Sequence, residues 1–280
     1  MRLLALALLL VAPPLGAQEF TFEEGPITGQ IGNLATIEVP AGFAFVNKAG
    51  MPGFNAATGN LHSPDDVGAL YPLNDSPYIV FFSFDDIGYV KDDDKDELDA
   101  SGMMRAFQEN EDAANKERQR RGLPSLSTVG WSREPYYDAE TRNLTWGVRL
   151  RSGDSDGEVI NHNIRMLGRK GVMRVIVADD PQLIDEAVAD FTPLLDTFEF
   201  SDGSRYEDFR SGDKVAKYGL AGLVVGGGLL AAAKTGLLGK LGKFLKFIII
   251  AVIAAFAAGA RWIKGLFGGG SAREQPRHRT

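Results

Sequence analysis

The sequence predicts an α+β domain built on an antiparallel sheet with two main helices, followed by a C-terminal transmembrane helical hairpin. Two observations lead to this prediction. Between residues 18 and 210, short runs rich in β-branched and aromatic residues are interrupted by two longer helical patterns. After residue 211, two apolar runs of 21 residues each are separated by a lysine-rich stretch, and each run is long enough to cross a membrane as a helix.

The strands follow from alternating polarity and from the turn residues between them. The expected strands are residues 35–39, 43–46, 78–84, 144–150, 159–167, 172–177 and 198–200. The first two flank Pro40-Ala41-Gly42 and form either a hairpin or a strand–turn–strand unit. The strands at 159–167 and 172–177, joined across residues 168–171, form the clearest hairpin.

Two helices are expected between these strands. One covers residues 98–121 and is ended by Gly122 and Pro124, and the other covers residues 181–196. An antiparallel sheet with an early long helix, and a late helix before a phenylalanine-rich strand, is similar to the Mog1/PsbP-like fold. This is an analogy, and a fold does not by itself define a function.

The N-terminus has the pattern of a secretory signal peptide. Met1-Arg2 precedes a nine-residue apolar run at 3–11, and small residues follow up to Ala17, where we expect cleavage. The alternative is a short uncleaved anchor. Nine helical residues, however, cover only about half of a ~30 Å bilayer core.

The C-terminal part predicts a membrane anchor over residues 211–267, with helices at about 218–238 and 247–267. The simplest arrangement exports the domain 18–210 and turns in the cytoplasm through the lysine-rich connector between the helices. The basic, disordered tail 268–280 would then lie outside, against the positive-inside preference. A single crossing, with the other segment in the interface, is the alternative.

Small residues in these segments could allow close helix packing. Gly222 and Gly226, and likewise Ala255 and Gly259, are spaced as small-x-x-x-small faces. They could pack on each other or on a second copy of the chain. Chance occurrence in an alanine- and glycine-rich segment explains either motif alone at least as well.

Charge is divided unevenly along the chain. Residues 211–280 carry eleven Lys/Arg and two acids, a net +9, so the whole-chain charge of −7 leaves −16 on residues 1–210. An acidic body argues against nucleic acid as a partner, since backbone binding needs concentrated positive charge. The chain has no cysteine, which excludes disulfides, thiolate metal sites and cysteine nucleophiles.

Candidate chemistry is sparse. The three histidines are His62, His162 and His278, and no pair has the spacing of a zinc site. No nucleophile elbow, P-loop or dinucleotide motif follows a strand. The aromatic residues of the region 131–146 could line a groove, although packing within the sheet explains them more simply. They are Trp131, Tyr136, Tyr137 and Trp146.

The acidic cluster from Asp85 to Asp99 is the densest polar feature, and such oxygens suit hard cations. An EF-hand template started at Asp92 fails, because Glu97 stands where glycine is required and Met103 where a bidentate glutamate belongs. The alternative is an acidic loop that complements a helix N-terminus, with Asp99 as the cap. We therefore assign no catalytic, cofactor-binding or metal residue.

Several segments, taken in their order along the chain, resemble the motifs of a known family. They are Gly88–Asp94, Ala113–Arg118, Gly122–Pro124, Trp131 with Pro135–Asp138, Leu144–Gly147, Asn163–Arg169, Tyr206–Phe209 and Lys214–Leu220. With them, the chain resembles a bacterial family of predicted membrane-anchored proteins, domain of unknown function 2167. The resemblance implies a bacterial membrane protein with an exported domain, and it supplies no activity and no functional residues.

The sequence therefore favours a non-enzymatic binding or envelope-assembly module, held at the inner membrane with its domain on the extracytoplasmic side. Its expected partners are the lipid bilayer and an envelope protein, with self-association through the glycine-rich helix as a further possibility. One alternative is a metal-dependent envelope enzyme that uses the acidic cluster at 92–97 with His62 or His162. Another is an oligomeric membrane element that the exported domain regulates.

Overall fold

A computed structural model describes residues 20–58, 60, 62–74, 78–120, 122, 124–153 and 157–225. The predicted signal peptide at 1–17, most of the two predicted membrane helices and the predicted tail 268–280 lie outside the described residues. Within the described part of the chain, no helix has both the length and the apolar character that a membrane crossing requires.

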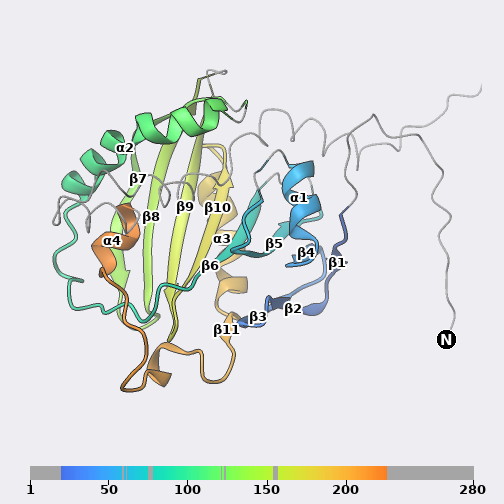
Figure 1. Ribbon diagram of the computed structural model, residues 1–280. Helices are drawn as coiled ribbons and strands as arrows, with labels where there is room; N and C mark the ends of the chain where they lie inside the picture. Colours follow the sequence, from blue (N-terminus) through green and yellow to red (C-terminus); the bar gives the residue numbers. More distant parts are fainter. Residues whose placement is uncertain are drawn as a thin grey trace, which may run out of the picture.

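An eight-stranded antiparallel sheet forms the body of the protein (Figure 1). Its strand order is β1-β4-β5-β6-β10-β9-β8-β7. The strands are β1 (Glu23–Glu24), β4 (Phe43–Asn47), β5 (Asp66–Pro72), β6 (Ile79–Asp85), β7 (Leu126–Asp138), β8 (Asn143–Ser152), β9 (Glu158–Leu167) and β10 (Val172–Asp179). The expected α+β class with a mostly antiparallel sheet is thus confirmed.

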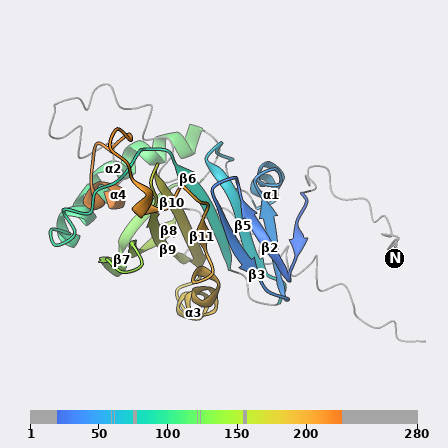
Figure 2. The same cartoon turned by 90° about the horizontal axis from the view of Figure 1, so that it is seen from below.

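A small sheet and one helix cover one face. The small sheet has the order β11-β3-β2, and α3 lies next to it, on the side away from α2 (Figure 2). The bounds are β2 (Ile27–Ile31), β3 (Ala35–Val39), β11 (Glu199–Phe200) and α3 (Ile184–Leu195). Side chains from both sheets and from α3 form a single core, in which Phe191 of α3 packs edge-on against Phe82 of β6.

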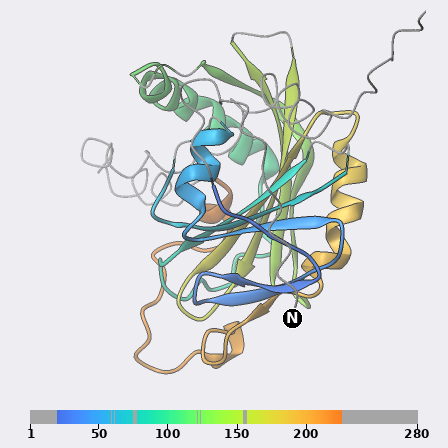
Figure 3. The same ribbon diagram turned by 90° about the vertical axis from the view of Figure 1, so that its right-hand side faces the viewer.

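The opposite face carries α1 (Met51–Ala57), α2 (Ala100–Arg120) and α4 (Leu220–Val225), as Figure 3 shows for α1 and α2 across the sheet from α3. Alternate residues of β9 serve the two faces. Ile160 and Ile164 join the core under α3, whereas Val159 and Leu167 join the core under α2 and α4.

The strongest sequence signals are confirmed. β9 and β10 form the expected hairpin, with Leu167 opposite Val172. α2 begins after Asp99, whose carboxylate accepts a hydrogen bond from the Gly102 backbone N–H at 3.0 Å, so the predicted cap is present. The helix is followed by Gly122 at φ 70°, a left-handed conformation that glycine adopts without strain.

The strands at 35–39 and 43–46 do not form the hairpin that was one of the two expected arrangements. β3 and β4 are consecutive strands but do not pair, because β3 joins β2 in the small sheet while β4 joins β1 and β5 in the large one. The turn at 40–42, with Gly42 at φ 91°, directs the chain from one sheet to the other. The strand–turn–strand reading is therefore correct, and the hairpin is wrong.

Candidate functional site

The acidic loop before α2 directs two carboxylates inward, and Asp92 is the first of them. Its Oδ2 accepts hydrogen bonds from the Tyr137 hydroxyl and the Arg142 guanidinium, both at 3.0 Å, and Oδ1 accepts one from the Tyr206 hydroxyl at 3.3 Å. Tyr137 lies on β7, Arg142 in the β7–β8 turn and Tyr206 in the short helix η1 (Tyr206–Asp208). Asp92 thereby joins a loop, a hairpin and a C-terminal segment.

Aromatic rings surround this carboxylate. Tyr89 stacks on Tyr206 with 4.4 Å between ring centroids and contacts Phe209 at 4.2 Å, and the Arg142 guanidinium lies 5.1 Å from the centre of the Tyr206 ring. Burial raises the pKa of Tyr206, and it raises the pKa of Tyr137 to about 12. Both hydroxyls are therefore protonated and act as donors at neutral pH.

Asp94 is the second inward carboxylate, and it holds the start of α4. Its Oδ1 accepts the Leu220 backbone N–H at 2.9 Å and its Oδ2 accepts that of Ala221 at 3.1 Å. These are the first N–H groups of the helix, which have no partner within the helix itself. The carboxylate also fills the space beside Gly219, where a Cβ would meet it at 2.5 Å.

The segment between the last strand and α4, residues 201–219, is here called the strap. Arg169 pairs with Asp213 through two hydrogen bonds of 2.7 and 2.9 Å, and this guanidinium lowers the pKa of Asp213 to about 2. Backbone bonds of 2.8 Å join Tyr89 N–H to the Lys214 carbonyl, and Ala216 N–H to the Tyr89 carbonyl. The strap is therefore held along the surface of the domain. The strap, Asp92, Asp94 and α4 together are called the junction.

A cavity of about 300 Å³ lies at the junction. The cavity is lined by lysines and aspartates together with residues of the strap. The lining residues are Lys91, Asp93, Asp94, Val215, Ala216, Lys217, Tyr218 and Gly219. Every lining residue belongs either to the acidic loop or to the chain that leads into α4. A group bound in the cavity would therefore contact both parts of the junction.

Three other acids of the cluster have separate partners. Asp85 pairs with Arg174 at 3.2 Å, Asp86 lies 3.7 Å from the Lys214 ammonium, and Asp99 caps α2. Among the described residues, no group of three or more histidine or carboxylate side chains could hold a metal ion. Asp85, Asp86 and Asp99 thus serve ion pairs and a helix start.

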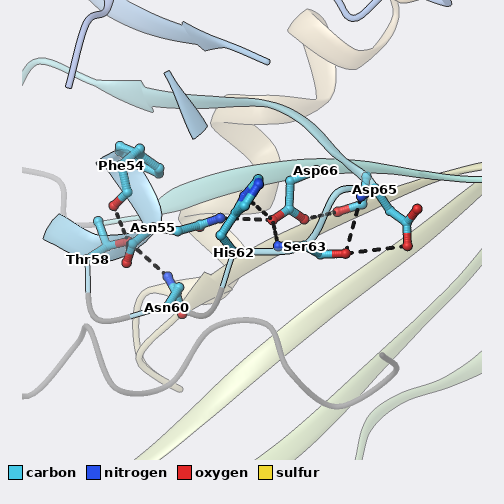
Figure 4. Close-up of polar contacts among 9 residues, drawn as sticks. Phe54, Asn55, Thr58, Asn60, His62, Ser63, Asp65 and Asp66 are labelled. Atoms are coloured by element: carbon cyan, nitrogen blue, oxygen red, sulfur yellow. Dashed lines mark hydrogen bonds and ion pairs between the residues drawn. The ribbon is translucent and has the colours of Figure 1, made fainter. Parts of the chain in front are cut away.

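His62 lies away from this cluster, in the loop between α1 and β5. Figure 4 shows Asn55, His62 and Ser63 converging on Asp66. The Asp66 carboxylate accepts the Asn55 amide and the Ser63 backbone N–H, both at 2.8 Å, and lies 3.6 Å from His62 Nδ1. The Ser83 hydroxyl donates to the same carboxylate at 3.0 Å. This network holds the loop against the sheet.

His162 is buried on β9, on the face that carries α3. Burial, with a smaller effect of Arg133, lowers its pKa to about 4, so the ring is neutral at physiological pH. The structure therefore brings neither His62 nor His162 into contact with the acidic cluster.

The buried imidazole predicts a pH dependence of stability. Because its folded pKa is below the unfolded value of about 6.5, the unfolded chain binds the proton first as pH falls. We expect this group to remove about 3 kcal/mol of unfolding free energy between pH 7 and pH 4. Urea denaturation of His162→Gln should show a correspondingly shallower loss over that range, and parallel curves for the two proteins would contradict the assignment.

The aromatic residues of the β7–β8 hairpin mainly contribute to packing rather than to a groove. Trp131 packs edge-on against Phe107 of α2 at 5.5 Å and donates its indole N–H to the Ala100 carbonyl at 3.0 Å. Trp146 is fully buried and Tyr137 donates to Asp92 of the junction, whereas Tyr136 is exposed. The packing interpretation is thus confirmed for the two tryptophans.

A buried polar row on β9 has no counterpart in the sequence prediction. Arg165 is 5% exposed, and its guanidinium lies 4.6 Å from the centre of the Trp146 ring and donates to the Ile164 carbonyl. Burial, with the nearby Arg174, lowers the pKa of Arg165 to about 9. β9 is buried along nearly its whole length, and the apolar neighbours Ile164 and Met166 on either side of Arg165 are the sequence signal that could have identified it.

The fold and the junction define an α+β protein with a C-terminal segment that packs back onto the domain. The sequence matches the family described as "Protein of unknown function (DUF2167)" over residues 23–257, and the chain belongs to this family. The resemblance predicted from the motifs is confirmed. The family description names no activity.

No curated protein matches the chain. Among solved structures, the solution structure of cyanobacterial PsbP (CyanoP) from Synechocystis sp. PCC 6803 is similar, with a TM-score of 0.37 and 11% sequence identity. The similarity covers 69% of this chain and 99% of that one. A likeness at this level does not assign a fold, so the Mog1/PsbP-like expectation stays a prediction.

Proposed function

We propose that the protein is a membrane-anchored, exported binding or envelope-assembly module without catalytic activity. The observation that carries this proposal is the junction, in which the chain leading to the apolar C-terminal segments is fixed to the domain. Asp94 holds the start of α4, and Arg169 holds the strap through Asp213. A domain joined in this way would present its surfaces at a set orientation to the membrane.

The charge of the domain supports a cationic partner. Residues 1–210 carry a net −16, and a surface with one dominant sign attracts the opposite sign and repels its own. A basic segment of an envelope protein fits this description. The association should weaken at high salt, because surface charges are screened within about 8 Å at physiological ionic strength.

A second candidate is favoured by the same junction. If the apolar segments form an oligomeric membrane element, the contact of Asp94 with α4 gives the domain a direct mechanical connection to it. A partner or ligand in the cavity beside Lys91 and Lys217 would then alter the position of α4. In this case the domain is a regulator.

Crosslinking in intact envelopes tests the proposal. The tagged full-length chain should stay in the membrane fraction after an alkaline wash and should recover the same partner in repeated preparations. The matched control is the same domain on an unrelated anchor. Recovery of the partner by both proteins supports the binding module, and recovery by the native chain alone supports the oligomeric element. A chain that is washed off the membrane, or that yields no specific crosslink, contradicts the proposal.

Removal of the Asp94 carboxylate tests the rigid connection. Asp94→Ala leaves the first N–H groups of α4 without their acceptor, and we expect a loss of about 1 kcal/mol of unfolding free energy. The matched control, Asp93→Ala, changes an exposed neighbour with the same charge and should stay within about 0.5 kcal/mol of the native chain. Equal effects, measured by chemical denaturation of the two full-length proteins in detergent, would contradict the role of Asp94.

A further inference from the structure

The residues of α4 have the burial of a domain core. Leu220 is 0% exposed and Leu223 7%, and Val224 and Val225 are equally inaccessible. They share one hydrophobic cluster with Val90, with Met103 of α2 and with Leu144 and Trp146 of β8. A side chain that faces lipid is exposed when no lipid surrounds the protein. These side chains are instead covered by the protein itself.

Local details fix α4 in this position. Asp94 accepts the first two N–H groups of the helix, and Gly219 gives it room to approach. Gly222 lies against the Tyr218 ring, where a Cβ would come within 2.7 Å. The first glycine of the Gly222/Gly226 spacing is therefore already in contact with the chain's own tyrosine, and its surface serves the domain.

The burial of α4 changes the length available for a first crossing. The apolar segment 218–238 has 21 residues, but residues 218–225 are used by the domain, so that 13 remain. As a helix they would extend about 20 Å at 1.5 Å per residue, against a hydrocarbon core of about 30 Å. The first segment is then too short to cross.

We infer that the chain crosses the membrane once, through residues 247–267, and that the first apolar segment begins as part of the domain. The inference rests on the anchoring proposed above. A single crossing places the three arginines of the tail on the side opposite the domain, with Arg261 and Lys264 near that end of the crossing, and it leaves Lys234 and the connector's three lysines on the domain side. A hairpin exchanges these two groups between the sides, and because the groups are nearly equal in charge the inference is carried by the burial of α4.

The stretch before the crossing has a sequence suited to the membrane surface. Lysines recur at 234, 240, 243 and 246, and leucines and phenylalanines lie between them. Basic residues interleaved with large apolar ones are typical of a helix that lies in the interface. In a single crossing these lysines would lie on the domain side and contact the lipid headgroups.

The absence of cysteine allows a direct test on the full chain. Three single substitutions keep all charges: Ser211→Cys in the strap, Gly242→Cys in the connector and Ser271→Cys in the tail. Each protein is treated in sealed membrane vesicles with a membrane-impermeant maleimide, before and after the vesicles are opened. Ser211→Cys marks the domain side, since Ser211 is exposed on the domain.

A single crossing predicts that positions 211 and 242 react from one side and position 271 only from the other. Reaction of 211 and 271 from one side, with 242 opposite, means two crossings and overturns the inference while the anchoring stands. Reaction of all three from one side means that the chain does not cross, which overturns the inference and leaves attachment to the surface. Loss of the protein from the membrane fraction overturns the proposed anchoring itself.

Discussion

Truncation of Leu220 to alanine is expected to lower the unfolding free energy of the domain by about 2–5 kcal/mol, the usual effect of emptying a buried leucine site. Leu220 is fully buried and contacts the core between α2 and β8. The loss should appear as a shifted midpoint in chemical denaturation of the full-length protein in detergent. The domain's own tryptophan fluorescence reports on it, because Trp146 lies in the same core.

Val215→Ala is the matched control for this prediction. Val215 lies five residues earlier in the strap and is 42% exposed, so its truncation should change stability by less than about 0.5 kcal/mol. If the first apolar segment were surrounded by lipid from its start, Leu220→Ala would leave the domain as stable as the native chain. That result would contradict both the packing of α4 and the single crossing.

The second large effect is expected at Asp92. Asp92→Ala leaves the Tyr137 hydroxyl without its acceptor and Arg142 without its counter-charge, whereas the Tyr206 hydroxyl keeps the Val90 carbonyl at 3.0 Å as acceptor. Hydrogen bonds to a charged group contribute about 1.5–3 kcal/mol each, and partial exposure of Arg142 reduces its share. We expect a loss of about 3 kcal/mol in denaturation experiments.

A double-mutant cycle separates this network from the general effect of removing an acid. The loss from Asp92→Ala should shrink by about 1 kcal/mol when Tyr137 is already phenylalanine, because one of the bonds no longer exists to be broken. Asp96→Ala removes an exposed carboxylate of the same loop and should have little effect. Additive effects of the Asp92 and Tyr137 substitutions would contradict the proposed bond.

The fold could be predicted where local pattern and turn chemistry agree. The β9–β10 hairpin has alternation on both arms and a short polar turn, so its pairing is set locally. The pairing of β3 is set by β2 and β11, and the short connection to β4 gives no indication of this. α1 was not predicted, because Pro52 and Gly53 dilute its helical pattern.

The junction was beyond sequence reasoning for a different reason. Asp99 could be identified as a cap because its bond is to a residue three positions away. The partners of Asp92 and Asp94 lie much farther along the chain, Tyr137 at 45 positions and Leu220 at 126. Nor does composition distinguish α4 from the start of a membrane helix, since both are apolar and only their surroundings differ.

The docking of α4 has a consequence for the order in which the chain completes its core. The helix supplies part of the core beneath α2 and β8, yet it follows every strand of the domain in the sequence. A polypeptide synthesised from its N-terminus can assemble the sheets early, but it lacks Leu220 and Leu223 until the last part of the domain emerges. Completion of the core is thus coupled to arrival of the apolar segments. A chain cut before residue 220 would expose apolar surface of this core and become a substrate for proteolysis.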